Sequence, residues 1–423
     1  MLTGVAPDKL RLVSNKPEKR TTYWPGLDGI RAWAFLMVIC HHCGPIPDFA
    51  KPRLIAGWAQ QWIANGWISI DLFFVISGYL MASLLASEHS KYGSISLKLF
   101  YTRRILRIWP PFYLSVFAAM CVFPFIEYHN WTWPQYQSLC RSMVPMICFL
   151  GNFQGPNLNH LVAAGKMIWP LWSLCVEEQF YLFLPISLIL VRSLSMRLVL
   201  YTGVLVSSVV LRGMLIAGGG GHGDWYLNTF SHLDPLMIGV LLGLLNERLN
   251  IFDKMSKRPY AGAFLFAISF GAAAAIIRLA PPVQDNGSIW TMGVLVNALV
   301  FAGLITSTCS FSPFQKFLSW SPTLDIGKKT YSMYLWHYWV LTTVLGWQQS
   351  LHLPDNAALW CVRLVVSFAL TYGIACLSWK FLEAPVLRFK DKFQPEARRK
   401  APPVHLAPVE VRELVGANSA KVE

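Results

Sequence analysis

Charged side chains are scarce in this sequence of 423 residues. Only 14% of the residues are Asp, Glu, Lys or Arg, whereas 54% are apolar and the mean hydropathy is +0.43. This composition excludes an ordinary water-soluble globular domain and indicates several membrane-spanning helices. It leaves the chemistry open, because transferases, transporters and polymerases of surface polymers share it.

Metal-binding and processing signals are also missing. Apart from Cys40 and Cys43, which lie within the first apolar run, the nine cysteines form no CxxC motif, and no two such motifs combine into a spacing typical of a metal site. The polar N-terminus and the long first apolar run do not fit a cleavable signal peptide. We therefore expect no disulfide framework and no bound metal.

Long apolar runs predict an all-α, polytopic membrane protein of about ten transmembrane helices. The runs lie near residues 28–46, 62–86, 108–127, 168–191, 198–217, 232–247, 261–279, 291–309, 330–347 and 357–381. A weaker apolar stretch at 143–150 is expected to be a buried or re-entrant piece of a long loop, 128–167.

The positions of Lys and Arg predict the orientation in the membrane. If the N-terminus is cytoplasmic, only Lys51, Arg53, Arg141 and Lys166 fall on the outer side, and most of the 36 Lys and Arg residues fall inside. We therefore expect both termini in the cytoplasm. The net charge of +14 then reflects topology, so anionic lipids and an anionic cytosolic cosubstrate are the expected partners, rather than nucleic acid.

The chain is expected to form one transmembrane domain over residues 24–387. A cytoplasmic segment, 1–23, precedes it. A basic, proline-bearing tail, 388–423, follows it and is expected to be disordered in the cytoplasm.

The first apolar run carries Arg31 near its beginning and His42 near its end. In a helix, eleven positions return to within about 20° of the same face and advance about 16 Å along the axis. One wall of this helix therefore presents a cation at one depth and an imidazole at another. Buried titratable groups in a membrane favour a functional role, although an interfacial anchor with a core histidine is the alternative.

Four further sequence blocks follow Arg31 and His42 in a fixed order. They are Gly66-Trp-Ile-Ser-Ile-Asp71, Arg103-Arg104-Ile-Leu-Arg107, Trp172-Ser-Leu-Cys-Val-Glu177-Glu178 and Tyr331-Ser-Met-Tyr-Leu-Trp-His337. Together the five blocks resemble the acyltransferase family 3 of integral membrane acyltransferases.

The resemblance implies an acyltransferase that moves an acyl group, usually acetyl, from cytosolic acyl-CoA to a hydroxyl group. Surface glycans, lipid-linked sugars and small secreted molecules are the implied acceptors. The implied location is the bacterial inner (cell) membrane. Some members of the family carry a C-terminal SGNH hydrolase domain, which we do not expect in this chain.

The resemblance identifies His42 as the catalytic histidine. A neutral imidazole whose other nitrogen is held by a carboxylate can take a proton from a hydroxyl, or can itself be acylated. We expect Glu177 and Glu178 at a similar depth, with one of them orienting His42 or closing a network with Arg31. A charge-paired structural network is the alternative for the two glutamates.

Arg104 and Arg107 are three positions apart, so they share a helix face. The resemblance assigns them to cofactor binding, and guanidinium groups suit the phosphates of acyl-CoA. A positive anchor at a cytoplasmic helix end is the alternative.

Three more residues are expected to contact substrate or to support the site, namely Asp71, Tyr181 and Asp234. His337 fits a core position as well as a catalytic one. Trp131, Trp133 and Tyr136 lie in the long loop and suggest a surface that stacks on sugar rings.

A transporter or flippase that uses buried charges is the alternative function. Such a protein typically shows two related halves with interrupted helices, and no internal repeat is visible in this sequence.

Overall fold

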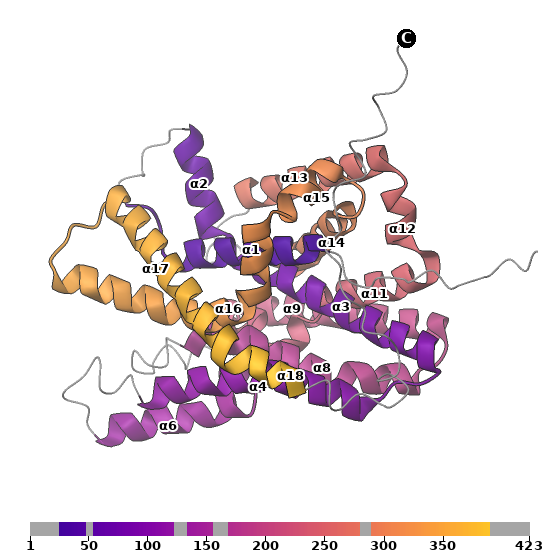
Figure 1. The fold of residues 1–423 in the computed structure, drawn as a ribbon, viewed down its shortest axis with the longest axis horizontal. Coiled ribbons are helices and arrows are strands. Elements are labelled where there is room, and N and C mark those ends of the chain that lie inside the picture. The colour runs from indigo at the N-terminus through magenta and orange to yellow at the C-terminus, as the bar shows by residue number, and fades with distance from the viewer. Residues whose placement is uncertain (1–24, 48–53, 122–132, 155–167, 280–288, 390–423) are drawn as a thin grey trace, which may run out of the picture.

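The computed structural model describes residues 25–47, 54–121, 133–154, 168–279 and 289–389. Every regular element within these ranges is a helix, which confirms the all-α prediction (Figure 1). The longer helices are α1 (Pro25–His42), α2 (Leu54–Ala64), α3 (Ser69–Tyr92), α4 (Leu97–Cys121), α6 (Trp133–Ile147), α8 (Trp172–Leu190), α9 (Leu194–Ala217), α11 (Asp234–Leu249), α13 (Pro259–Leu279), α14 (Trp290–Ser307), α16 (Ser321–Ser350) and α17 (Ala357–Ser378). The shorter ones are η1 (Gly66–Ile68), η3 (Trp169–Leu171), α10 (His222–Tyr226), η4 (Thr229–Ser231), α12 (Ile251–Ser256), α15 (Ser312–Leu318), η6 (Trp379–Glu383) and α18 (Ala384–Phe389).

Six helical stretches of the described chain are long and apolar enough to cross a membrane. They are Gly66–Tyr92, Trp169–Leu190, Leu194–Ala217, Pro259–Arg278, Trp290–Ser307 and Ala357–Phe389. The expected count of about ten is not confirmed, because α1, α4, α11 and α16 coincide with predicted spans but are shorter or less apolar. The predicted segment 1–23 and nearly all of the predicted tail 388–423 lie outside the described residues.

Helix α3 forms the centre of the molecule. In its most apolar stretch 83% of the residues are buried, against 17% for α13 and 22% for α9. A helix that is apolar all round is stable when neighbours cover every side. The outer helices instead expose large apolar side chains, such as Val199, Phe264 and Val365, as expected of helices that face lipid.

Helices α3 and α11 approach each other closely because glycines lie between them. A Cβ atom on Gly78 would come within 2.1 Å of the backbone oxygen of Leu236. A Cβ atom on Gly239 would come within 2.2 Å of the backbone oxygen of Val75. Small residues let membrane helices gain dispersion contacts along their backbones, so this pair forms a rigid unit.

Helix α1 packs against both α3 and α16. A Cβ atom on Gly327 of α16 would come within 2.1 Å of the backbone oxygen of Asp28. In Figure 1, α1 lies near the middle of the molecule, with α16 and α17 running to one side of it. The wall of α1 that carries Arg31 and His42 is therefore enclosed by protein.

The turn between α3 and α4 fixes the position of the arginines on α4. Gly93 ends α3 with a φ of +72°, a backbone conformation that glycine adopts without strain. The Glu88 carboxylate accepts a hydrogen bond from the backbone N–H of Ser96 at 3.0 Å and lies 3.3 Å from Arg103. These contacts tie the first turns of α4 to the end of α3.

The predicted loop 128–167 contains a helix that the apolar pattern did not indicate. Helix α6 covers Trp133–Ile147 and packs beside α4 (Figure 1). It includes Arg141 and Pro145, so it forms no continuous apolar run. The stretch 143–150 is therefore the end of α6 and the turn after it.

We expect Gly78→Ala to lower the stability of the folded protein, because the added methyl group collides with the backbone of α11. Overpacking of this kind costs about 1–3 kcal/mol. Thermal unfolding in detergent, followed by tryptophan fluorescence, measures the loss. Gly346→Ala is the control, since no heavy atom lies within 4 Å of the new Cβ. Equal unfolding midpoints for the two variants would contradict the close packing.

Candidate active site

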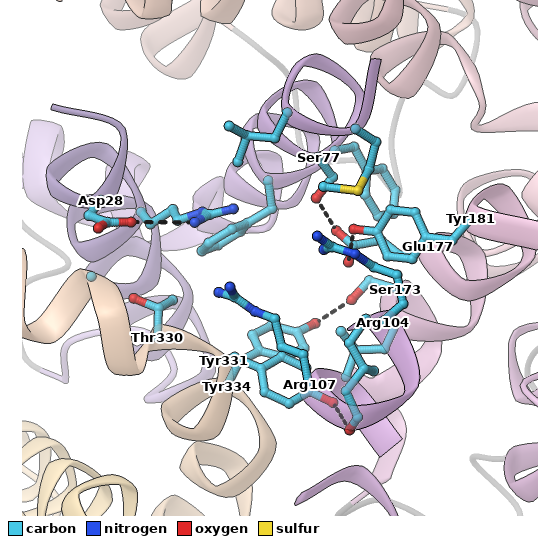
Figure 2. A pocket seen from close by; sticks show the side chains of 18 of the residues that line it. Asp28, Ser77, Arg104, Arg107, Ser173, Glu177, Tyr181, Thr330, Tyr331 and Tyr334 are labelled. Carbon is cyan, nitrogen blue, oxygen red and sulfur yellow. Dashed lines mark hydrogen bonds and ion pairs between the residues drawn. The ribbon is translucent and has the colours of Figure 1, made fainter. Parts of the chain in front are cut away.

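A cavity of about 380 Å³ opens between α1, α3, α4, α8 and α16. We call it the arginine cavity, because Arg31, Arg104 and Arg107 line it from two sides. Figure 2 shows Arg104 and Arg107 reaching from α4 into the space, with Glu177, Tyr181 and Ser77 beside them.

Neither Arg104 nor Arg107 forms a salt bridge or a side-chain hydrogen bond with another described residue, although carboxylates such as Glu177 and Asp28 lie nearby. The Nε atom of Arg104 is buried without a hydrogen bond, and its guanidinium lies 5.9 Å from the Phe100 ring centre and 5.8 Å from that of Tyr181. Arg107 is exposed to the cavity, and no ion pair to it is present in the described chain. Guanidinium groups that form no salt bridge within the protein bind anions well.

The other cationic groups of the region differ in their surroundings. Arg31 lines the arginine cavity and lies 3.4 Å from Asp28 on the preceding turn of α1. Arg103 pairs with Glu88 and does not line the cavity. Lys328 of α16 adds a further positive charge to the cavity wall.

Glu177 faces the arginine cavity and Glu178 does not. The Glu177 carboxylate accepts hydrogen bonds from the hydroxyls of Ser77 at 2.8 Å and Tyr181 at 3.2 Å. Glu178 accepts a hydrogen bond from the indole N–H of Trp109 at 2.9 Å. Two adjacent residues on a helix point about 100° apart, which separates their environments.

A second cavity of about 210 Å³ contains His42. We call it the histidine cavity. Five tryptophan and tyrosine side chains and two more histidines line it: Trp67, Trp169, Trp172, Tyr226, Tyr334, His41 and His222. Burial lowers the pKa of His222, on the short helix α10, to about 4, so this ring is neutral at neutral pH.

The two cavities share Ile70 and Tyr334, which line both of them. The hydroxyl of Tyr334 donates a hydrogen bond to the backbone oxygen of Pro170 at 2.6 Å and lies 2.8 Å from the Ser173 hydroxyl. Residues of α3 and α16 therefore form the boundary between the cavities, and contacts with η3 and α8 hold Tyr334 in place.

The expected carboxylate does not hold His42. Instead, the Nδ1 atom of His42 lies 3.1 Å from Nε2 of His337 on α16. The glutamates lie at another depth: Trp172 lines the histidine cavity, and Glu177 is five residues further along α8, which is about 7.5 Å of helix. Glu177 lines the arginine cavity together with Arg31, whereas His42 lines the histidine cavity.

The histidine that a carboxylate does hold is His232. Its Nε2 atom lies 2.8 Å from Asp71, and both side chains are fully buried. Asp71 also receives contacts from Tyr226 at 3.4 Å and Asn297 at 3.5 Å. Neither Asp71 nor His232 lines either cavity, so the network ties α3 to the segments around it.

Asp234 belongs to another buried network. Both of its carboxylate oxygens accept hydrogen bonds from Arg212, at 2.8 and 2.9 Å, and both side chains are fully buried. Arg212 also donates to the backbone oxygens of Ser231 and Thr291. This network lies outside both cavities and joins α9, α11 and α14.

Sequence reasoning missed several residues of the cavities, among them Ser77, Ser173 and Tyr334 and the aromatic wall of the histidine cavity, and it left His337 undecided. A signal was present for α16: Tyr331, Tyr334 and His337 are spaced by three, so they share one helix face. No group of three or more His, Cys, Asp or Glu residues able to hold a metal is found in the described ranges. Trp131, Trp133 and Tyr136 carry no described side chains.

Comparison with known proteins identifies the family of the chain. A family model described as an acyltransferase domain matches residues 24–379. The chain is 29% identical over 374 residues to the O-acetyltransferase OatA of Staphylococcus aureus strain NCTC 8325, and equally to that of strain COL. Each alignment covers 86% of this chain but only 57% of the relative. No solved structure matches the chain significantly.

We expect Asp234→Asn to destabilise the fold, because it leaves the buried charge of Arg212 without its counter-ion. Breaking a buried pair in this way costs about 3–5 kcal/mol. The unfolding midpoint in detergent measures it. Asp253→Asn serves as the control, since its pairing with Lys257 is exposed. A normal midpoint together with lost catalysis would instead place Asp234 in the site.

Proposed function

The chain belongs to the acyltransferase family 3, whose model matches residues 24–379, and from that premise we propose that it is an integral membrane O-acetyltransferase. The reaction moves an acetyl group from acetyl-CoA to a hydroxyl group of an acceptor. The name O-acetyltransferase, which these relatives carry, supports both the acetyl group and the oxygen acceptor.

The observation that carries the proposal is the junction of two chemically different cavities at Ile70 and Tyr334. The arginine cavity offers unpaired guanidinium groups for the phosphates of coenzyme A. The histidine cavity offers the imidazole of His42. Because Arg31 and His42 are about 16 Å apart along α1, the arrangement suits a long, thin donor whose reactive end reaches the boundary.

The chemistry at the boundary is a single acyl transfer. The acceptor oxygen attacks the thioester carbonyl carbon, a new C–O bond forms, and the C–S bond breaks. His42 takes the proton of the hydroxyl as general base, and that proton goes on to the leaving thiolate, so coenzyme A departs as a thiol. Glu177, Arg31, Arg104 and Arg107 act on the donor side in this scheme.

The walls of the histidine cavity favour a carbohydrate as the acceptor. Trp67, Trp169, Trp172 and Tyr226 present apolar ring faces with polar edges. Such surfaces cover the apolar faces of sugar rings while nearby polar groups bind the hydroxyls.

The charge distribution supports entry of the donor from the cytosol of a bacterium. Lys98, Arg103, Arg104 and Arg107 gather in the first half of α4, on the side that the positive-inside rule assigns to the cytoplasm. We place both termini on that side of the inner membrane, where anionic lipids meet the basic segments. The acceptor then enters the histidine cavity from the outer side.

Replacing Arg104 and Arg107 together by Gln should raise the KM for acetyl-CoA by about 100-fold or more, since each charge-assisted hydrogen bond contributes about 1.5–3 kcal/mol and two are lost. Coenzyme A release by purified protein in nanodiscs measures the change. Arg103→Gln is the matched control on the same helix, because Arg103 pairs with Glu88 outside the cavity. An equal effect of both changes would argue against specific donor binding.

His42→Gln should lower the rate of coenzyme A release at least 100-fold with little change in KM, because it removes the general base. Sealed vesicles of defined orientation add a test of sidedness. Acetyl-CoA should react only from the side of the chain termini. Protein that binds no acetyl-CoA and releases no coenzyme A, yet conducts a solute, would favour a transporter instead.

A further inference from the structure

The side chain of His337 lies in the core of the protein next to the candidate catalytic histidine. It has no exposed surface. Its Nδ1 atom lies 2.7 Å from the backbone oxygen of Tyr334, and its Nε2 atom lies 3.1 Å from Nδ1 of His42. Phe35 packs edge-on against the ring at 5.7 Å. These contacts fix the plane of the His337 imidazole.

The contact with Tyr334 determines which nitrogen of His337 carries hydrogen. A carbonyl oxygen accepts hydrogen bonds and never donates, so Nδ1 of His337 must be the protonated nitrogen. None of the described carboxylates lies at hydrogen-bond distance from His337 or His42. A second proton would leave a buried cation without a counter-ion, which is costly. In the neutral ring, Nε2 of His337 is therefore an acceptor.

The acceptor role of His337 also determines which nitrogen of His42 carries hydrogen. Since Nε2 of His337 accepts, Nδ1 of His42 must donate, and this assigns the hydrogen of neutral His42 to Nδ1. The other nitrogen, Nε2, keeps its lone pair. His42 lines the histidine cavity whereas His337 does not, so the basic nitrogen is the one left for a ligand.

We propose that His337 is a positioning residue that holds His42 in the Nδ1-protonated tautomer and so keeps Nε2 ready to take the proton of the acceptor. The proposal rests on the function proposed above. His337 takes the place that a carboxylate often fills beside a catalytic histidine. Unlike a carboxylate, it adds no standing charge to an apolar region. When His42 accepts a proton at Nε2, its Nδ1–H still donates to His337.

The surroundings make His337 the principal polar partner of His42. The ring of His41 lies 5.3 Å from that of His42, and Tyr338 lies edge-on at 5.1 Å. His41 is engaged elsewhere, with its Nδ1 atom 2.9 Å from the backbone oxygen of Ile63. The backbone carbonyl of Val38, one turn earlier on α1, also interacts with the His42 ring. An experiment must therefore distinguish the effect of the Val38 carbonyl on the His42 tautomer from the effect of His337.

Two substitutions separate positioning from packing. His337→Leu fills much of the space without an acceptor, and His337→Gln restores an acceptor oxygen near His42. We expect His337→Leu to lower kcat about 100-fold with the KM for acetyl-CoA within twofold of the wild type. We expect His337→Gln to recover kcat to within about tenfold. Equal losses in both variants, in step with their unfolding midpoints, would mean that His337 is only a core residue.

A spectroscopic measurement tests the tautomer without relying on activity. Histidine labelled with ¹⁵N in the full-length protein distinguishes Nδ1–H from Nε2–H, and His42→Gln identifies the signal. We expect Nδ1–H for His42 in the wild type and in His337→Gln, and a mixture in His337→Leu. An unchanged Nδ1–H signal in His337→Leu would assign the role to Val38 and overturn the proposal. If the wild-type protein shows the expected tautomer but transfers no acetyl group, the proposed function is refuted, whereas the effect of His337 on the tautomer still stands.

Discussion

The packing of α1 against α16 is the contact on which both cavities depend. Gly327 lets the two backbones meet beside Asp28, at one end of α1. At the other end, His42 meets His337. Between these points the two helices supply groups to both cavities. Because both are long helices with internal backbone hydrogen bonds, the spacing between the cationic and imidazole groups is set by helix geometry rather than by loops.

Hydrogen bonding separates the buried polar residues into two kinds. Arg212 with Asp234, and Asp71 with His232, satisfy one another fully within the protein. Such networks hold membrane helices together, because lipid offers no alternative partners. Arg104 instead has a buried nitrogen without a partner. Arg104 lines the arginine cavity rather than a buried network, so its guanidinium is available to bind an anion there.

The sequence could predict which residues share a face of one helix, because helix periodicity determines this. It could predict few contacts between residues that lie far apart in the sequence. The eleven-residue spacing predicts that Arg31 and His42 share one face of α1, and in the structure each of them lines one of the two cavities. Periodicity could not decide between Glu177 and Glu178, because adjacent positions differ only in the direction they face. The contact of His42 with His337 joins residues 295 positions apart, so no local pattern reveals it. Helix α6 was missed for another reason: a search for apolar runs passes over an amphipathic helix.

The glycine contact between α3 and α11 also has a consequence for motion. Backbones that touch at Gly78 and Gly239 cannot slide past each other by a fraction of a turn without collision. These two helices therefore form a fixed frame, unlike the rocking halves of an alternating-access transporter. Entry and exit of large ligands would then depend on the helices that border the cavities from outside this frame, namely α1, α4, α8 and α16. We therefore expect ligand exchange to require only a local opening of these walls against the frame of α3 and α11.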